Sequence, residues 1–174
     1  KYGIELAVDI INEKHDLDLP FASTEGIPNL DGAKIKLVVS DVQDLPEKGQ
    51  SEVERLVTQE KVSALIGCYL SSVTQTASQA AERLGVPMVN GSSSAVGLTE
   101  RGFKYFFRTG PHDSNIVGNM FDLVDDVKNE KDQPVKTMAL IHENTLQGAD
   151  MGEVAKQYAN ERGYEVVGVF PFPP

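Results

Sequence analysis

The feature that most constrains the fold of this chain is a steady alternation of two hydrophobic patterns. Short apolar runs bounded by glycine, proline or polar residues predict buried strands, while longer segments with apolar residues three or four positions apart predict helices. The predicted strands cover residues 33–41, 62–67, 86–90, 104–109, 135–143 and 164–170. The predicted helices cover residues 2–14, 45–61, 71–85, 113–130 and 148–163.

Strands that alternate with helices are typical of parallel sheets, because a right-handed helical crossover returns the chain to the start of the next strand. In such sheets both faces are covered, so the strands read as short apolar runs, as residues 86–90 do. The sequence therefore predicts the α/β class, with open parallel sheets and helices on both faces.

The charge of the chain limits its partners. Of its 174 residues, 26 are acidic and 16 are basic, and the formal net charge is -10. None of the predicted helices carries the stripe of lysine and arginine that nucleic acids or anionic membrane surfaces attract. We therefore expect neither nucleic acid nor an anionic membrane surface as a partner.

Cofactor motifs and cysteines are sparse. Cys68 is the only cysteine, which excludes an internal disulfide and a cysteine-based zinc cluster. Neither the dinucleotide pattern GxGxxG after a strand nor the phosphate-binding pattern GxxxxGK[ST] occurs. No apolar stretch approaches the roughly 18 residues that a membrane span requires. We predict no cofactor, no metal site and a packing role for Cys68.

Two hydroxyl-rich loops mark the expected functional site. One contains Ser71 and Ser72 after the strand at 62–67, and the other contains Ser92, Ser93 and Ser94 after the strand at 86–90. Ligands of open parallel sheets bind outside the carboxyl ends of the strands, where such loops converge. Hydroxyl groups, glycine-exposed backbone N–H groups and helix N-termini together favour a carboxylate or a phosphate.

Each of these polar residues also has a simpler interpretation. A serine at the start of a helix is most often only its N-cap, and Asp113 or Ser114 is the candidate cap of the helix at 113–130. Asp41 and Asp44 favour turn or capping roles over cation binding, because further oxygen ligands cannot be identified. The histidines are scattered, and the serine run lacks the GxSxG pattern of a hydrolase nucleophile. We therefore predict no catalytic residue.

One long run carries a resemblance to a known family. It reads VSALIGCYLSSVTQTASQAAERLGVPMVNGSSSAVGLTERGFKYFFRT and is preceded by GIELAVDIINE and VVSDVQDLPEKGQSEVERLV. These segments resemble, in order, the type I periplasmic binding proteins of ABC importers, specifically the branched-chain amino acid binding group. Such proteins are two-lobed clamps that hold an amino acid in the cleft and present it to a membrane permease. The resemblance implies a non-enzymatic extracytoplasmic receptor, periplasmic or lipid-anchored at the outer face of the cell membrane.

The resemblance also implies roles for single residues. Ser71 matches a position whose hydroxyl and N–H hold the ligand carboxylate. Ser92 matches a position that offers its backbone carbonyl to the ligand ammonium group, and Ser94 matches a hydroxyl residue that serves both groups. Gln147 stands where many members carry an aromatic residue, so we expect room for a polar amino acid, an amide or another small carboxylate.

By the same resemblance, residues 1–109 correspond to most of the N-terminal lobe without its first strand. Residues 111–174 correspond to the opening half of a truncated second lobe. A sheet without a central strand leaves backbone groups unpaired. We expect compensation by a neighbouring copy, in a strand-exchanged oligomer, or by rearrangement of the later strands.

Two other functions stay open at this point. A phosphate-handling enzyme domain, similar to a sugar-phosphate isomerase, would cradle the phosphoryl group in a serine-rich turn and use Glu143 or His142 as acid or base. A sensory ligand-binding domain of a receptor would share the clamp.

Overall fold

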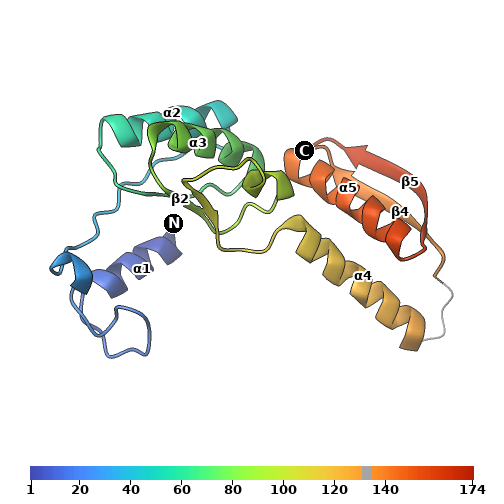
Figure 1. Cartoon of the computed structure of the whole chain (residues 1–174), viewed down its shortest axis with the longest axis horizontal. Helices are drawn as coiled ribbons and strands as arrows, with labels where there is room; N and C mark the ends of the chain where they lie inside the picture. The colour runs from blue at the N-terminus through green and yellow to red at the C-terminus, as the bar shows by residue number, and fades with distance from the viewer. Residues whose placement is uncertain (131–134) are drawn as a thin grey trace. The chain divides into compact units, whose positions relative to one another are not determined.

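The computed structural model describes residues 1–130 and 135–174, and it separates into two compact units, Lys1–Ser40 and Asp41–Pro174. Figure 1 traces the order of the elements along the chain. Among the described residues, none of the helices combines the length and the apolar character that crossing a bilayer requires.

The first unit begins with the predicted amphipathic helix, α1 (Tyr2–Asn12), which is followed by a loop and a short 3-10 turn, η1 (Pro28–Leu30). The strand predicted at 33–41 is wrong. Its backbone pairs with other described residues only through a single bridge between Ile27 and Ala33.

The side chain of Asn12 takes the place of a strand partner for part of this segment. Its Nδ2 donates to the carbonyl of Ile35 and its Oδ1 accepts the N–H of Ile35, both at 2.7 Å. A strand needs a neighbouring backbone to complete its hydrogen-bond ladder. An apolar pattern shows that a segment suits a sheet, and it carries no information about whether that neighbour is present.

The second unit contains a parallel sheet in the order β1-β2-β3. Its strands are β1 (Leu65–Ile66), β2 (Met88–Asn90) and β3 (Phe106–Arg108). Helix α2 (Pro46–Thr58) precedes β1, α3 (Ser71–Leu84) connects β1 to β2, and the 3-10 turn η2 (Val96–Thr99) lies between β2 and β3. Helix α3 packs on β2 and β3, and α2 lies alongside α3 (Figure 1). Gly85 ends α3 in the left-handed conformation, as the sequence predicts.

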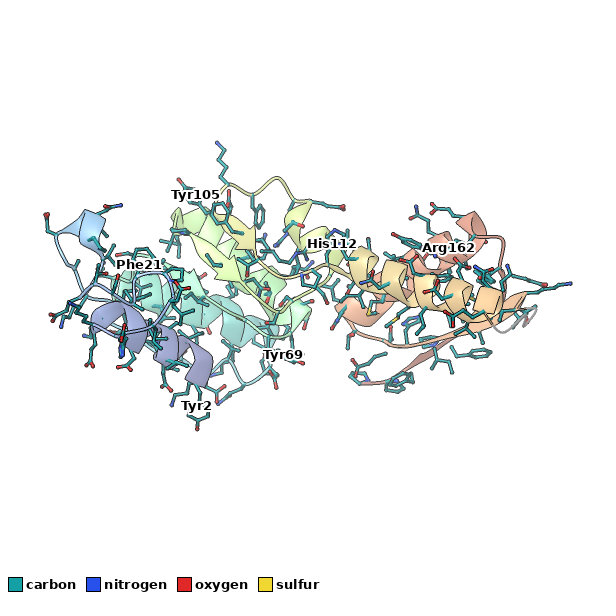
Figure 2. The ribbon with its side chains drawn as sticks, turned by 90° about the horizontal axis from the view of Figure 1, so that it is seen from below. Tyr2, Phe21, Tyr69, Tyr105, His112 and Arg162 are labelled. Atoms are coloured by element: carbon teal, nitrogen blue, oxygen red, sulfur yellow. The ribbon has the colours of Figure 1, made fainter. Side chains whose placement is uncertain are left out.

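A two-stranded parallel sheet follows in the same unit. Its elements are α4 (Asp113–Glu130), β4 (Thr137–Glu143), α5 (Leu146–Glu161) and β5 (Glu165–Phe172). Helix α5 packs on both strands and against α4. Arg162, labelled in Figure 2, fastens the end of α5 to α4 through ion pairs of 2.6 Å to Asp122 and 2.7 Å to Asp125.

Each sheet has a hydrophobic core of its own. Leu65, Met88 and Phe106 bring the three strands of the first sheet into one cluster with residues of α3. Val117 and Phe121 of α4 meet Tyr164, next to β5, in the other. The α/β class and the parallel direction of the strands are therefore confirmed.

Candidate functional site

Asn90, at the end of β2, holds the two hydroxyl-rich loops together. Its Nδ2 donates to the carbonyls of Gly67 and Cys68, at 2.9 and 2.8 Å. Its Oδ1 accepts the N–H groups of Ser92 and Ser93, at 3.1 and 2.8 Å. Asn90 is fully buried. Sequence analysis missed this residue, although an asparagine that ends an apolar strand before a glycine is a turn signal.

Ser93 completes the link between the loops. Its buried hydroxyl donates to the carbonyl of Tyr69 at 2.9 Å and lies 2.6 Å from the hydroxyl of Thr74 in α3. The exposed hydroxyl of Ser92 donates to the carbonyl of Cys68 at 3.1 Å. The predicted convergence of the two loops is thus present, and the hydroxyls of Ser92 and Ser93 are used to maintain it.

Ser71 and Ser72 form the first turn of α3, but neither caps it. The N-cap position is occupied by Leu70, which makes no side-chain cap hydrogen bond. Within the described residues, the buried hydroxyl of Ser71 takes part in one long hydrogen bond, from the N–H of Ala95 at 3.4 Å. The capping role is therefore wrong for these serines, and Ser71 keeps most of its hydrogen-bonding capacity.

Ser94 meets Gln147 at the start of α5. Gln147 Nε2 donates to Ser94 Oγ at 2.7 Å, although the two residues are 53 positions apart. The backbone carbonyl of Ser94 accepts the N–H of Asp113 at 2.9 Å. The structure therefore brings together two of the predicted site residues, Ser94 and Gln147, and adds Asp113 beside them.

The first turn of α5 fixes the place of Gln147. Thr145 caps the helix, its Oγ1 accepting the N–H of Gly148 at 3.1 Å. A Cβ atom at Gly148 would lie 2.0 Å from the carbonyl oxygen of Glu143, so only glycine allows this close approach of α5 to β4. Gln147 and Gly148 thus have different roles. Gly148 allows α5 to pack closely on β4, and Gln147 directs its amide at Ser94.

Asp113 is a buried acid that sequence analysis treated only as a possible cap. That role is wrong, as is a cap at Ser114. Helix α4 begins at Asp113 itself, and the ring nitrogen Nδ1 of His112 accepts the N–H of Ser114 at 3.2 Å. The side chain of Asp113 is 0% exposed, and neither carboxyl oxygen has a hydrogen-bond partner of standard geometry among the described residues.

Burial raises the pKa of Asp113, because the charged form is poorly solvated there. The negative charge of Asp150 acts in the same direction, while the nearby side chains of Ser94 and Gln147 and the charge of Arg108 oppose it. The guanidinium of Arg108 is directed elsewhere, donating to the carbonyl of Ala95 at 2.8 Å.

An apolar groove of about 520 Å³ lies between α4, β4 and α5. Val117, Phe121 and Met151 contribute to its lining, as do the acid and base candidates Glu143 and His142. The groove-lining residues include Gln147, but none of the five serines of the two loops. The structure therefore places His142 and Glu143 on the lining of a groove to which these serines do not contribute.

Two further expectations are confirmed by the contacts. Cys68 packs against the core of the first sheet, and burial raises the pKa of its thiol to about 11. Asp41 Oδ1 accepts the N–H of Gln43 at 2.9 Å, which is a turn role. Across the described ranges, no group of three or more histidine, cysteine and acidic residues is arranged to hold a metal ion.

Comparison with known proteins identifies relatives along the whole chain. A family model described as "Periplasmic binding protein" matches residues 1–174. A curated relative, the Leu/Ile/Val-binding protein homolog 8 of Brucella abortus, is 29% identical over 170 residues. That match covers 95% of this chain and 38% of the relative, so the chain spans well under half of the relative's length.

Solved structures share the fold. An ABC transporter substrate-binding protein from Desulfitobacterium hafniense, in complex with Leu, matches with a TM-score of 0.78 and 24% identity, covering 98% of this chain and 45% of that one. A branched-chain amino acid transporter substrate binding protein from Streptococcus pneumoniae, in complex with isoleucine, matches with a TM-score of 0.64 and 29% identity, covering 82% and 39%.

Proposed function

The chain belongs to the periplasmic binding protein family, and from this premise we propose that the full-length protein is the solute-binding receptor of an ABC importer. It binds an amino acid or a similar small carboxylate between two lobes, outside the cytoplasm, and delivers it to a membrane permease. The relative in Brucella abortus is named a Leu/Ile/Val-binding protein homolog, and the Streptococcus pneumoniae structure holds isoleucine, which supports an amino acid as the ligand.

The carboxylate of the ligand binds at the first turn of α3. Ser71 offers a hydroxyl there, together with a backbone N–H that has no partner within the helix, because the first four N–H groups of any α-helix lack one. The positive end of the helix dipole favours an anion at the same place. Ser72, on the same turn, adds a second hydroxyl.

The ammonium group of the ligand binds at the second loop, to the backbone carbonyl of Ser92 and the hydroxyl of Ser94. Gln147 forms the opposing wall from α5. The observation that carries this assignment is the hydrogen bond of 2.7 Å between Gln147 and Ser94, which joins segments on either side of the crossover from β3 to α4. We place the boundary between the two lobes at that crossover, between Thr109 and Pro111.

A receptor without catalysis fits the chemistry better than a phosphate-handling enzyme. Such an enzyme would use His142 or Glu143 as its acid or base. Both residues line the apolar groove, to which the serine loops do not contribute. The Nδ1 atom of His142 lies 3.0 Å from the carbonyl oxygen of Glu143, within reach of a hydrogen bond. The carboxylate of Glu143 accepts a hydrogen bond from the hydroxyl of Thr145 at 3.4 Å. Within the described part of the chain, no hydrogen bond or ion pair links either residue to Ser71 or Ser94.

The test is ligand binding by the full-length protein with Ser71→Ala, Ser94→Ala and the double variant. A thermal-shift screen of L-amino acids, small carboxylates and sugar phosphates selects the ligand, because a ligand that binds only the folded state raises the melting temperature. Calorimetric titration then gives the affinity. Each single variant should weaken binding roughly ten- to hundredfold, since a hydrogen bond to a charged group contributes about 1.5–3 kcal/mol.

The matched control is Ser63→Ala, which removes an exposed hydroxyl just before β1. It should leave the affinity unchanged. Sugar phosphates as the only stabilising ligands, or full affinity in the double variant, would contradict the proposed function.

A further inference from the structure

Arg108, the last residue of β3, holds the segment that follows the second hydroxyl-rich loop. Its guanidinium bridges the two ends of the 3-10 turn η2. Nη1 donates to the carbonyl of Ala95 at 2.8 Å, and Nη2 donates to the hydroxyl of Thr99 at 2.7 Å. Because a guanidinium is planar and its N–H donors keep a fixed geometry, two acceptors held by one such group cannot move independently.

Ala95 connects this anchor to the expected ligand site. It is 1% exposed and follows Ser94 directly in the chain, and its N–H donates to the hydroxyl of Ser71 at 3.4 Å. Ala95 thus contacts Arg108 through its carbonyl and Ser71 through its N–H. A displacement of Ala95 would therefore shift Ser94 and change the hydrogen bond to Ser71, and these two serines carry the hydroxyls assigned to the ligand.

The other end of the same loop is held by the next residue of the chain, Thr109. Its N–H donates to the carbonyl of Asn90 at 3.0 Å and continues the pairing of β2 with β3. Arg108 and Thr109 together hold residues 91–94 from both ends, through Ala95 and Asn90. The N–H contact belongs to the backbone, whereas the contact to Ala95 depends entirely on the side chain of Arg108.

We propose that Arg108 is a positioning residue for the ligand: it keeps the loop of residues 91–94 in its binding conformation through the carbonyl of Ala95. This inference rests on the proposed function and adds to it a residue that sets the affinity without touching the ligand. Binding to an ordered loop costs less conformational entropy than binding to a mobile one. Without Arg108 the ligand would have to order the loop itself, so the affinity would fall although every ligand contact remains available.

Arg101 offers a comparison, because it fastens the same region through contacts that do not reach this loop. Its guanidinium donates to the carbonyls of Leu98 and Gln75 and, at 2.7 Å, to the hydroxyl of Ser78. The same group lies 4.2 Å from the centre of the ring of Phe103. These contacts attach η2 to α3 and to the core, so we expect Arg101 to affect stability and not the geometry of the loop.

The experiment measures stability and affinity on the same full-length variants. Chemical denaturation gives the stability, and calorimetric titration well below the melting temperature gives the affinity of the folded protein. The probe is whichever of the proteinogenic L-amino acids, succinate and glutarate raises the melting temperature of the wild type most. Arg108→Gln should weaken its binding about tenfold. Arg101→Gln is the matched control, which should lower the stability and leave the affinity within about twofold.

A double-mutant cycle separates positioning from general destabilisation. If Arg108 acts through the loop, its loss costs less affinity once the hydroxyl of Ser94 has been removed, because less remains to be positioned. In the Ser94→Ala background, Arg108→Gln should therefore weaken binding by no more than about a further threefold. Arg101→Gln should leave the affinity within about twofold in both backgrounds.

The outcomes separate the inference from the function on which it rests. Unchanged affinity in Arg108→Gln, or a loss that is equally large in the Ser94→Ala background, would overturn the inference and leave the receptor standing. A similar loss of affinity in Arg101→Gln would also overturn it, since general loosening would then explain both variants. Binding of none of the probes by the wild type would overturn the proposed function itself.

A second variant covers the case in which Arg108→Gln fails to fold. Arg108→Lys keeps the positive charge but lacks the planar arrangement of donors that bridges Ala95 and Thr99. Carried through the same cycle, it should weaken binding about threefold in the wild-type background and less in the Ser94→Ala background. Unchanged affinity in Arg108→Lys would then overturn the inference.

Discussion

Two polar clusters lie at the tips of the first sheet, and they differ in how completely their groups are paired. Asn90 uses both ends of its amide in short hydrogen bonds that join the two loops. Asp113 is equally buried, and neither of its carboxyl oxygens has a hydrogen-bond partner of standard geometry among the described residues. A satisfied buried network rigidifies the protein, whereas an unsatisfied group carries a desolvation cost that a ligand can offset.

The serines of the two loops also differ in how completely their hydroxyl groups are hydrogen-bonded. The hydroxyl of Ser93 lies within hydrogen-bonding distance of Thr74 and Tyr69, which assigns it to the scaffold. Ser71 makes one long hydrogen bond within the described part of the chain, and Ser94 is contacted by the exposed amide of Gln147. A run of three serines therefore contains residues of both kinds, and their hydrogen bonds rather than their positions in sequence separate them.

The largest effect that tests this division is on stability. Asn90→Ala removes the amide that joins the loops and leaves buried carbonyl and N–H groups unpaired. We expect the free energy of unfolding to fall by about 3 kcal/mol, since each unsatisfied buried group costs roughly 1–3 kcal/mol. Chemical denaturation of the full-length protein measures it. A loss below about 1 kcal/mol would show that the network contributes little to the scaffold.

The opposite sign is expected at the unsatisfied cluster. Asp113→Asn should raise the stability of the ligand-free protein at neutral pH, because it removes a poorly solvated buried charge and keeps a polar side chain of the same shape. Measurement of melting temperature for both proteins across pH checks this. A variant less stable than the wild type at pH 7 would show that the carboxylate has stabilising partners.

The pH dependence of that difference follows from the raised pKa. The folded state holds the proton of Asp113 more tightly than the unfolded state does, so this group favours folding most below its unfolded pKa, near 3.9. That contribution is lost as the pH rises through the higher folded value. The advantage of Asp113→Asn should therefore grow from about pH 4 toward neutral pH. A stability difference between the variant and the wild type that stays constant with pH would contradict the raised pKa of Asp113.

The smallest effect concerns Ser92. Among the described residues its exposed hydroxyl makes one hydrogen bond, to the carbonyl of Cys68, and the proposed ligand contact uses the backbone carbonyl of Ser92 instead. Ser92→Ala should change the free energy of unfolding by less than about 1 kcal/mol and the ligand affinity by less than about threefold. Denaturation and calorimetric titration on the same variant measure both. A large loss of affinity would give the hydroxyl a role at the ligand.

Hydrophobic periodicity predicted most of the helices and strands and the α/β class, because each core-facing pattern is local. The strand at 33–41 failed because pairing depends on a neighbouring backbone. The meeting of Ser94 with Gln147 could be expected only from resemblance to a family, since periodicity does not bring two distant segments together. The unpaired state of Asp113 could not be predicted at all, because it depends on where Arg108, Ser94 and Gln147 direct their hydrogen bonds.

The most direct test of the central claim is a crystal structure of the full-length protein with its preferred amino acid. The account predicts the ligand carboxylate at about 2.7–3.2 Å from the hydroxyl of Ser71, and the ligand amine at similar distances from the hydroxyl of Ser94 and the backbone carbonyl of Ser92. A ligand held by other residues, with Ser71 and Ser94 making no contact to it, would contradict the proposed site.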